Sequence, residues 1–330
     1  MITGKLTPRD CFNGFKKVVK RRFLGTPFSI NLEVTKQCNA RCSFCDYWHT
    51  KKEDRLEDYL PLVKKLSPLH VSITGGEPLL RKDIADIIRR LKEGDFVYLS
   101  LITNGRLLTE EKALEIWRAG LHQIGISLDF LDERHDAYRG IPGLYQHLSD
   151  LIPRLAKTEI DNISLQTIIM DENLDQILPI AEQAARWGVK VSYSSYCPHK
   201  NYNESGTIKK ERLEKLREVV DGILEAKKRL GNIISSDFYL SKIPEYFEKG
   251  GIAGCLAGQR WIQITPDGMM KACSEFPVAG SWTDFRPGFF KPVTCAQCWY
   301  SCRGEAQNPL TLKRIMELSR KSRKKSTRAD

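Results

Sequence analysis

A regular alternation of strand-like and helix-like segments constrains the fold of this 330-residue chain more than any other feature. Six runs rich in apolar, β-branched and aromatic residues begin at residue 29, and amphipathic stretches of helical period separate them. Because strands that alternate with helices form parallel sheets covered by helices, the pattern predicts an α/β fold. The strand-like runs are residues 29–35, 70–74, 96–103, 123–129, 162–170 and 189–194, and the helical stretches are residues 55–66, 82–93, 109–119, 143–157 and 173–187.

The alternation ends after residue 196, where the composition changes. A polar loop (201–207) and a charged amphipathic helix (208–230) precede residues 250–305, which combine five cysteines with many glycines, prolines and aromatic residues. A segment so poor in apolar periodicity does not fold easily without a metal. The expected parts are a basic amphipathic N-terminal helix (1–28), the six-stranded α/β domain (29–196), a helical linker (197–249), a cysteine-rich module (250–308) and a basic C-terminal helix and tail (309–330).

Ten cysteines are many for a chain without a secretion signal, and eight of them fall into two groups. In such a chain, clustered cysteines indicate metal or iron–sulfur ligation rather than disulfides. The first group, Cys38, Cys42 and Cys45, directly follows the first strand, where parallel α/β proteins build active sites. Three thiolates within eight residues can bind one face of an iron–sulfur cube and leave its fourth iron open. A zinc site, or cysteines that are simply buried, is the alternative.

A second motif, Gly-Gly-Glu-Pro at residues 75–78, follows the second strand. Alone it is a common turn. Together with the first cysteine group, and with Phe44 before its last cysteine, it resembles the radical SAM superfamily over residues 29–196. The resemblance implies a partial (β/α)6 barrel and a [4Fe–4S] cluster whose open iron binds S-adenosylmethionine. In that family, reduction of the cluster cleaves the cofactor to a 5′-deoxyadenosyl radical, which takes a hydrogen atom from the substrate or adds to it.

The resemblance also implies which residues contact S-adenosylmethionine. The two glycines expose backbone N–H and C=O groups at a strand end, and their carbonyls or Glu77 can accept from the methionine ammonium. In the family, residues at the ends of later strands contact the ribose and the carboxylate of the cofactor. For Thr103, Ser127 and Gln166, packing or turn hydrogen bonding at the strand end is the alternative role. Gln166 stands where relatives often carry Asn. The expected cofactor-binding residues are Phe44, Gly75, Gly76, Glu77, Thr103, Ser127 and Gln166.

The second cysteine group resembles the SPASM/Twitch extension of radical SAM enzymes. Its members are Cys255, Cys273, Cys295, Cys298 and Cys302. A Pro-Asp-Gly turn at residues 266–268 predicts a β-hairpin with Cys255 and Cys273 at its two ends. Five thiols cannot fill two four-iron clusters, so we expect one auxiliary [4Fe–4S] cluster, held by these two and by two of the remaining three. A zinc ribbon is the alternative. Cys197, at the end of the sixth strand, is expected to be a buried inert thiol.

The net charge of +11 is concentrated at the two ends of the chain. Residues 16–22 carry five basic and no acidic groups, and residues 313–330 carry eight basic and two acidic groups. This distribution argues against a broad nucleic-acid groove and is compatible with a peripheral contact with an anionic membrane surface. A packed helix over residues 8–23 and a solvated tail are the alternative. The sequence has no signal peptide and no membrane-spanning apolar run, so we expect a cytoplasmic protein.

These features predict a radical SAM enzyme, an oxidoreductase or transferase, that modifies a small-molecule or lipid substrate. An electron donor such as flavodoxin or ferredoxin is implied. Only 37 residues precede Cys38, too few for the leader-binding domain that peptide-modifying relatives often carry, so a peptide-modifying SPASM-type maturase is placed second. A non-enzymatic iron–sulfur or zinc protein that binds nucleic acid is the third alternative. No catalytic residue acting on the substrate is assigned, and the residues expected at the barrel mouth are Tyr193, Tyr196, Glu275 and Arg303.

Overall fold

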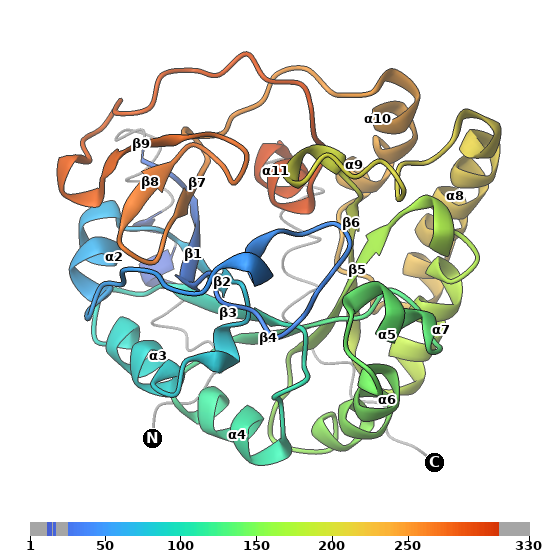
Figure 1. The fold of residues 1–330 in the computed structure, drawn as a ribbon, viewed down its shortest axis with the longest axis horizontal. Coiled ribbons are helices and arrows are strands. Elements are labelled where there is room, and N and C mark those ends of the chain that lie inside the picture. Colours follow the sequence, from blue (N-terminus) through green and yellow to red (C-terminus); the bar gives the residue numbers. More distant parts are fainter. Residues whose placement is uncertain (1–11, 15, 18–25, 310–330) are drawn as a thin grey trace.

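The six predicted strands form one parallel sheet, and three later strands extend it (Figure 1). The computed structural model describes residues 12–14, 16–17 and 26–309. Strands lie in the order β6-β5-β4-β3-β2-β1-β7-β8-β9, and every pair from β6 to β7 is parallel. The strands are β1 (Ser29–Thr35), β2 (His70–Gly75), β3 (Tyr98–Thr103), β4 (Gln123–Ser127), β5 (Ile163–Ile169), β6 (Lys190–Ser195), β7 (Trp261–Ile264), β8 (Met269–Lys271) and β9 (Val278–Ser281).

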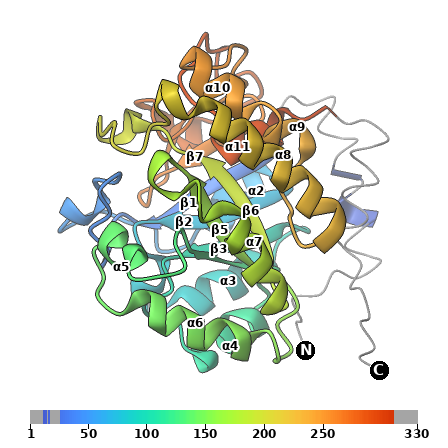
Figure 2. The ribbon, with the colours of Figure 1, turned by 90° about the vertical axis from the view of Figure 1, so that its right-hand side faces the viewer.

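Helices cover the outside of this curved sheet and make it a partial barrel (Figures 1 and 2). In α3, Ile84, Ile87, Ile88 and Leu91 recur at helical spacing and are all buried. The helices are α2 (Leu60–Leu66), α3 (Ile84–Lys92), α4 (Glu110–Arg118), α5 (Arg134–Arg139), α6 (Leu144–Leu155), α7 (Ile177–Arg186), α8 (Leu213–Leu230), α9 (Asp237–Leu240), α10 (Ile243–Lys249) and α11 (Ser301–Gln307).

The cysteine-rich segment joins the barrel through β7, which pairs in parallel with β1. The predicted hairpin is present: β7 and β8 are antiparallel, and Gly268 adopts the positive φ of 84° that the turn between them requires. The second cysteine group therefore sits beside the first strand of the barrel. Helix α11 packs against both β6, the last strand of the barrel, and β7 (Figure 1).

Two features differ from the sequence-based expectation. The short helix α5 lies between β4 and α6, where its six residues are too few to show a helical period. The helix predicted to begin at residue 55 begins at Leu60, where Asp58 Oδ1 accepts from the Leu60 amide at 2.8 Å and Pro61 occupies the first turn. The predicted basic helix over residues 8–23 and the tail over residues 310–330 lie largely or wholly outside the described residues. In the part of the chain that the structure describes, no helix is long and apolar enough to span a membrane.

Candidate active site

The first cysteine group lies on the loop that leaves the carboxyl end of β1. Cys42 is buried, whereas Cys38 and Cys45 are partly exposed. The loop is compact: the Ala40 amide donates to Cys38 Sγ at 3.4 Å, and the Cys45 amide donates to the Cys42 carbonyl at 3.2 Å. The loop thus presents its three thiols at the end of the sheet where active sites of parallel α/β proteins lie.

The thiols of this loop sit in surroundings that favour a bound cation. Burial raises the pKa of Cys38 to about 11 and also raises the pKa of Cys42, where nearby Arg139 opposes the effect. A thiolate in such a site requires positive charge beside it, which iron ions supply. Within the described residues, no three His, Cys, Asp or Glu side chains converge to hold a single metal ion. Three thiols on one loop are the donors by which proteins bind iron–sulfur clusters.

The two glycines at the end of β2 are required because the chain leaving β1 comes very close to them. The Gly76 amide donates to the Thr35 carbonyl at 2.8 Å, and the Glu77 amide donates to the Gln37 carbonyl at 2.9 Å. A Cβ atom on Gly75 would lie 1.9 Å from the Thr35 carbonyl oxygen, and one on Gly76 would lie 2.1 Å from that of Gln37. The expectation of an exposed amide is therefore wrong at Gly76, and the amides of residues 76 and 77 both hold the chain at the start of the cysteine loop.

Glu77 is fully buried and binds the protein itself. Its carboxylate accepts from the Leu79 amide at 3.0 Å, from Thr103 Oγ1 at 2.7 Å and from the Asn104 amide at 2.8 Å. Asn104 in turn donates to Asn39 Oδ1, inside the cysteine loop, at 2.8 Å. Glu77 thus connects the ends of β2 and β3 to the cysteine loop. The sequence reasoning missed Asn39 and Asn104, whose pairing only the fold reveals.

The segment after β4 forms a second support for the cysteine loop, which sequence reasoning also missed. Asp129 and Arg139 form a buried ion pair, and the Arg139 carbonyl accepts from the Arg41 amide at 2.9 Å. The Tyr138 ring stacks on Phe44 with 5.0 Å between ring centroids. The Tyr138 hydroxyl is buried without a partner in the described structure. These contacts fix the aromatic residue that precedes Cys45.

Ser127, the last residue of β4, is paired in register with Gln166, which lies in the middle of β5. The Gln166 side chain lies across Gly125, where a Cβ would be 3.1 Å from Gln166 Cγ, and its amide donates to Ser164 Oγ at 2.8 Å. Thr103, which is buried, ends the neighbouring strand β3. The structure therefore places these three expected cofactor contacts on neighbouring strands, with the Gln166 amide engaged by its own strand.

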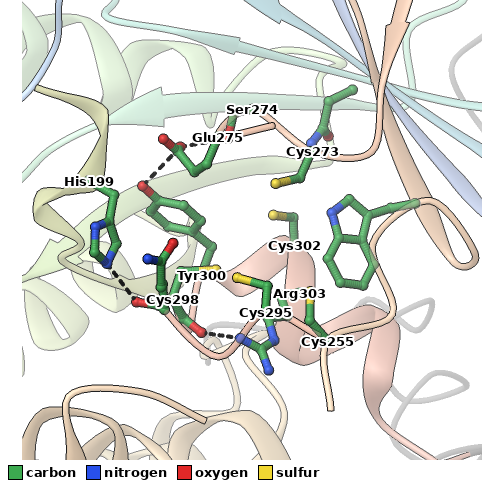
Figure 3. Close-up of a pocket in the computed structure, with 13 residues that line it drawn as sticks. His199, Cys255, Cys273, Ser274, Glu275, Cys295, Cys298, Tyr300, Cys302 and Arg303 are labelled. Carbon is green, nitrogen blue, oxygen red and sulfur yellow. Dashed lines mark hydrogen bonds between the residues drawn. The ribbon is translucent and has the colours of Figure 1, made fainter. Parts of the chain in front are cut away.

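The five cysteines of the second group line one pocket between the barrel and the C-terminal module (Figure 3). The pocket contains about 440 Å³ of empty space, open solvent included. Cys255 and Cys298 are buried, and Cys302 is exposed. Burial raises the pKa of Cys273 to about 11, so this thiol also requires a cation to ionise.

Charged and polar groups complete this pocket. Arg303 is fully buried and donates to the Cys298 carbonyl at 2.6 Å. Glu275 accepts from Tyr300 Oη at 3.3 Å and from Ser274 Oγ at 2.8 Å (Figure 3). A buried cation beside several thiols is an arrangement that fits an anionic thiolate-bound cluster.

Residues 197–203, the bridging segment, touch both cysteine groups. His199 Nε2 lies 3.1 Å from the carbonyl of Gln297, between Cys295 and Cys298. At the other end, Asn201 and Asn203 donate to the Ser43 carbonyl, inside the first cysteine loop, at 2.7 and 2.8 Å. One short segment after β6 therefore joins the two candidate cluster sites.

The remaining mouth candidates have different positions. Tyr193 is fully buried and donates to the Ile177 carbonyl of α7 at 2.8 Å, so its prediction as a mouth residue is wrong. Alternation along β6 turns this side chain outward. Tyr196 is buried and donates to the Asn203 carbonyl at 2.6 Å. Cys197 is buried as expected, with its sulfur 4.0 Å from the Gln297 carbonyl oxygen.

Comparison with known sequences decides the family. Residues 32–184 match the radical SAM superfamily. The chain contains a radical SAM domain. It is 26% identical over 320 residues to the PqqA peptide cyclase of Granulibacter bethesdensis, covering 85% of this chain and 83% of that protein. It is also 28% identical over 269 residues to a GTP 3′,8-cyclase of Clostridium perfringens, covering 74% and 79%. The chain is thus an enzyme with a radical SAM domain, and the non-enzymatic alternative is wrong.

Solved structures share the fold of this radical SAM enzyme. Streptococcus suis SuiB bound to precursor peptide SuiA superposes with a TM-score of 0.61 at 18% identity, covering 83% of this chain and 67% of that one. A native anSMEcpe structure with bound AdoMet superposes with a TM-score of 0.59 at 18% identity, covering 80% of each chain. The partial-barrel fold is confirmed. The cofactors of the superfamily, a [4Fe–4S] cluster and S-adenosylmethionine, are those expected from the sequence.

Proposed function

We propose that Cys38, Cys42 and Cys45 hold the [4Fe–4S] cluster and that this enzyme cleaves S-adenosylmethionine reductively. The observation that carries the proposal is the bracing of this loop from two sides, by the Glu77–Asn104 network and by the segment after β4. When bound and reduced, cluster and cofactor supply a 5′-deoxyadenosyl radical that removes hydrogen from substrate. The barrel interior shields such a radical from water.

The proposed S-adenosylmethionine site lies along the carboxyl ends of β2 to β5. Phe44, Gly75, Gly76, Thr103, Ser127 and Gln166 are its proposed contacts. Glu77 is assigned a positioning role, because its carboxylate already accepts three hydrogen bonds inside the protein. The carbonyls of the two glycines remain the proposed acceptors for the methionine ammonium.

The proposed auxiliary [4Fe–4S] cluster occupies the pocket of the second cysteine group. The proposed ligands are Cys255, in the segment before β7, and Cys273, just after β8, together with two of Cys295, Cys298 and Cys302. The convergence of all five on one pocket supports a single cluster (Figure 3).

The first proposed substrate is a peptide side chain. The similarity to a PqqA peptide cyclase extends over 85% of this chain, and SuiB, which shares the fold, binds a precursor peptide. A small molecule is the second candidate, because the similarity to GTP 3′,8-cyclase extends over 74% of the chain. No contact among the described residues favours a lipid or a membrane surface.

Stimulation of 5′-deoxyadenosine release separates these substrates. The reconstituted protein, reduced through flavodoxin or ferredoxin, is incubated with host peptide, aqueous metabolite and lipid fractions and with buffer. Stimulation by the peptide fraction that protease treatment abolishes is expected. Protease-resistant stimulation by the aqueous fraction would assign a small molecule, and stimulation by the lipid fraction alone would contradict both proposed classes.

A further inference from the structure

A buried positive charge without an acidic partner lies against the auxiliary pocket. Arg303 donates to the carbonyls of Cys298, Ile252 and Ala253 and to Gln307 Oε1, the last at 2.8 Å. None of these partners is charged, and no carboxylate of a described residue forms an ion pair with Arg303. A guanidinium that is fully removed from water costs free energy unless a negative charge lies nearby.

The pocket itself accounts for the missing negative charge. Arg303 lines it together with the five cysteines, and Figure 3 shows Glu275 on the opposite side, held by Tyr300 and Ser274. A thiolate-bound cluster in this pocket would place its negative charge beside the guanidinium. Arg303 is therefore the positively charged side chain that would lie next to such a cluster.

Arg303 also fixes this charge between the two cysteine-bearing segments. Ile252 and Ala253 lie just before Cys255 in the chain, and the Cys298 carbonyl belongs to the Cys-x2-Cys motif. Its planar donors thus hold the two segments together at the wall of the pocket that the cysteines line.

We propose that Arg303 is a positioning residue whose charge favours the reduced state of the auxiliary cluster and so raises its reduction potential. The inference rests on the auxiliary cluster of the proposed function. One-electron reduction adds one negative charge to a cluster, and a cation fixed in a low-dielectric pocket stabilises the more negative state more strongly. Arg303 thereby makes this cluster a better electron acceptor.

A redox titration followed by electron paramagnetic resonance tests the proposal. The full chain carrying Cys38→Ala, Cys42→Ala and Cys45→Ala serves as parent, so that only the auxiliary cluster gives a signal. Gln307→Glu replaces the amide oxygen that accepts from Arg303 Nε by a carboxylate oxygen and keeps the guanidinium itself. Gln307→Met is its control, because both variants lose the Gln307 hydrogen bond to the Gly254 carbonyl and only one adds charge.

Gln307→Glu is expected to lower the equilibrium constant for reduction of the cluster about tenfold, which corresponds to a midpoint potential about 59 mV lower. Gln307→Met is expected to keep the midpoint potential of the parent. Arg303→Lys, which keeps the charge and loses the fork, is expected to keep the potential and lose iron faster. Equal potentials in Gln307→Glu and Gln307→Met at full iron content would overturn the proposal, as would a lowered potential in fully loaded Arg303→Lys. A parent that binds no iron would refute the auxiliary cluster itself.

Discussion

Glu77 connects three segments of the site through one buried carboxylate, and its replacement tests that role. Glu77→Ala leaves the Leu79 amide, Thr103 hydroxyl and Asn104 amide without their acceptor. Because each buried unsatisfied donor costs about 1–3 kcal/mol, we expect a loss of about 3 kcal/mol or more in unfolding free energy. Anaerobic urea unfolding of the cluster-loaded protein measures it.

Glu77→Gln is the matched control, because its remaining carbonyl oxygen still accepts one or two of these bonds. Its loss of stability should be smaller than that of Glu77→Ala. Unchanged stability in Glu77→Ala together with abolished S-adenosylmethionine binding would contradict the positioning role and assign Glu77 a direct contact.

His135, beside the Asp129–Arg139 pair, makes stability depend on pH. Burial lowers its pKa to about 4, with Asp129 acting in the opposite direction and Arg139 reinforcing the effect. The unfolded chain therefore takes up the proton first, at a pKa of about 6.5. The free energy of unfolding therefore decreases as pH falls from about 6.5 through about 4. About 2 kcal/mol is lost between pH 7 and pH 5.

Urea unfolding of the wild type and of His135→Gln at pH 7 and pH 5 measures this effect. The wild type is expected to lose about 2 kcal/mol more than the variant, because the effects of all other groups and of the cluster cancel in the difference. Equal losses in the two proteins would contradict a neutral buried His135.

The sequence identified the chemistry-bearing residues better than it identified their contacts. Cys38, Cys42 and Cys45 could be recognised because their spacing is local and cluster ligation requires thiols. The reason for two glycines at residues 75 and 76 could not, because it depends on how close the Thr35 and Gln37 carbonyls come.

The bridging segment, residues 197–203, is the element that joins the two cysteine groups. Asn201 and Asn203 both donate to the Ser43 carbonyl. Since each bond contributes about 1 kcal/mol and the Asn201→Ala/Asn203→Ala variant loses both, the amide hydrogens of residues 38–46 should exchange about thirtyfold faster. Hydrogen–deuterium exchange by mass spectrometry measures the rates.

Tyr202→Ala provides the control for this double variant. Tyr202 lies between the two asparagines but is 86% exposed, so its removal should leave exchange of the cysteine loop unchanged. Equal exchange in the double variant, the control and the wild type would show that the bridging segment does not restrain the loop.

Elements with a strong local signal were predictable, and those fixed by distant partners were not. The six parallel strands follow from their apolar β-branched runs, and the β7–β8 hairpin from Pro-Asp-Gly at residues 266–268. Helix α5 is too short to show a period, and the parallel pairing of β7 with β1 joins residues more than 200 positions apart. Nothing local in the sequence marks that pairing.

At the scale of the whole molecule, one sheet holds both cysteine groups in a fixed relation. β1 leads into the first cysteine loop, and β7, its neighbour in the sheet, lies next to the pocket of the second. We therefore expect about eight irons per chain, and about four when Cys38, Cys42 and Cys45 are all replaced by alanine. Elemental analysis of anaerobically reconstituted protein checks both values.

Replacing Cys255 and Cys273 by alanine should also leave about four irons, now all in the first site. Four irons together with one zinc ion in the wild type would contradict the auxiliary cluster and leave the first site intact.

Release of 5′-deoxyadenosine shows whether the first cysteine loop supports reductive cleavage of S-adenosylmethionine. The reconstituted protein is reduced anaerobically with S-adenosylmethionine, and 5′-deoxyadenosine is quantified beside the Cys42→Ala variant. We expect the wild type to form 5′-deoxyadenosine and Cys42→Ala to form none. Intact S-adenosylmethionine after incubation with a fully loaded, reduced wild-type protein and the peptide, aqueous and lipid fractions would contradict the account.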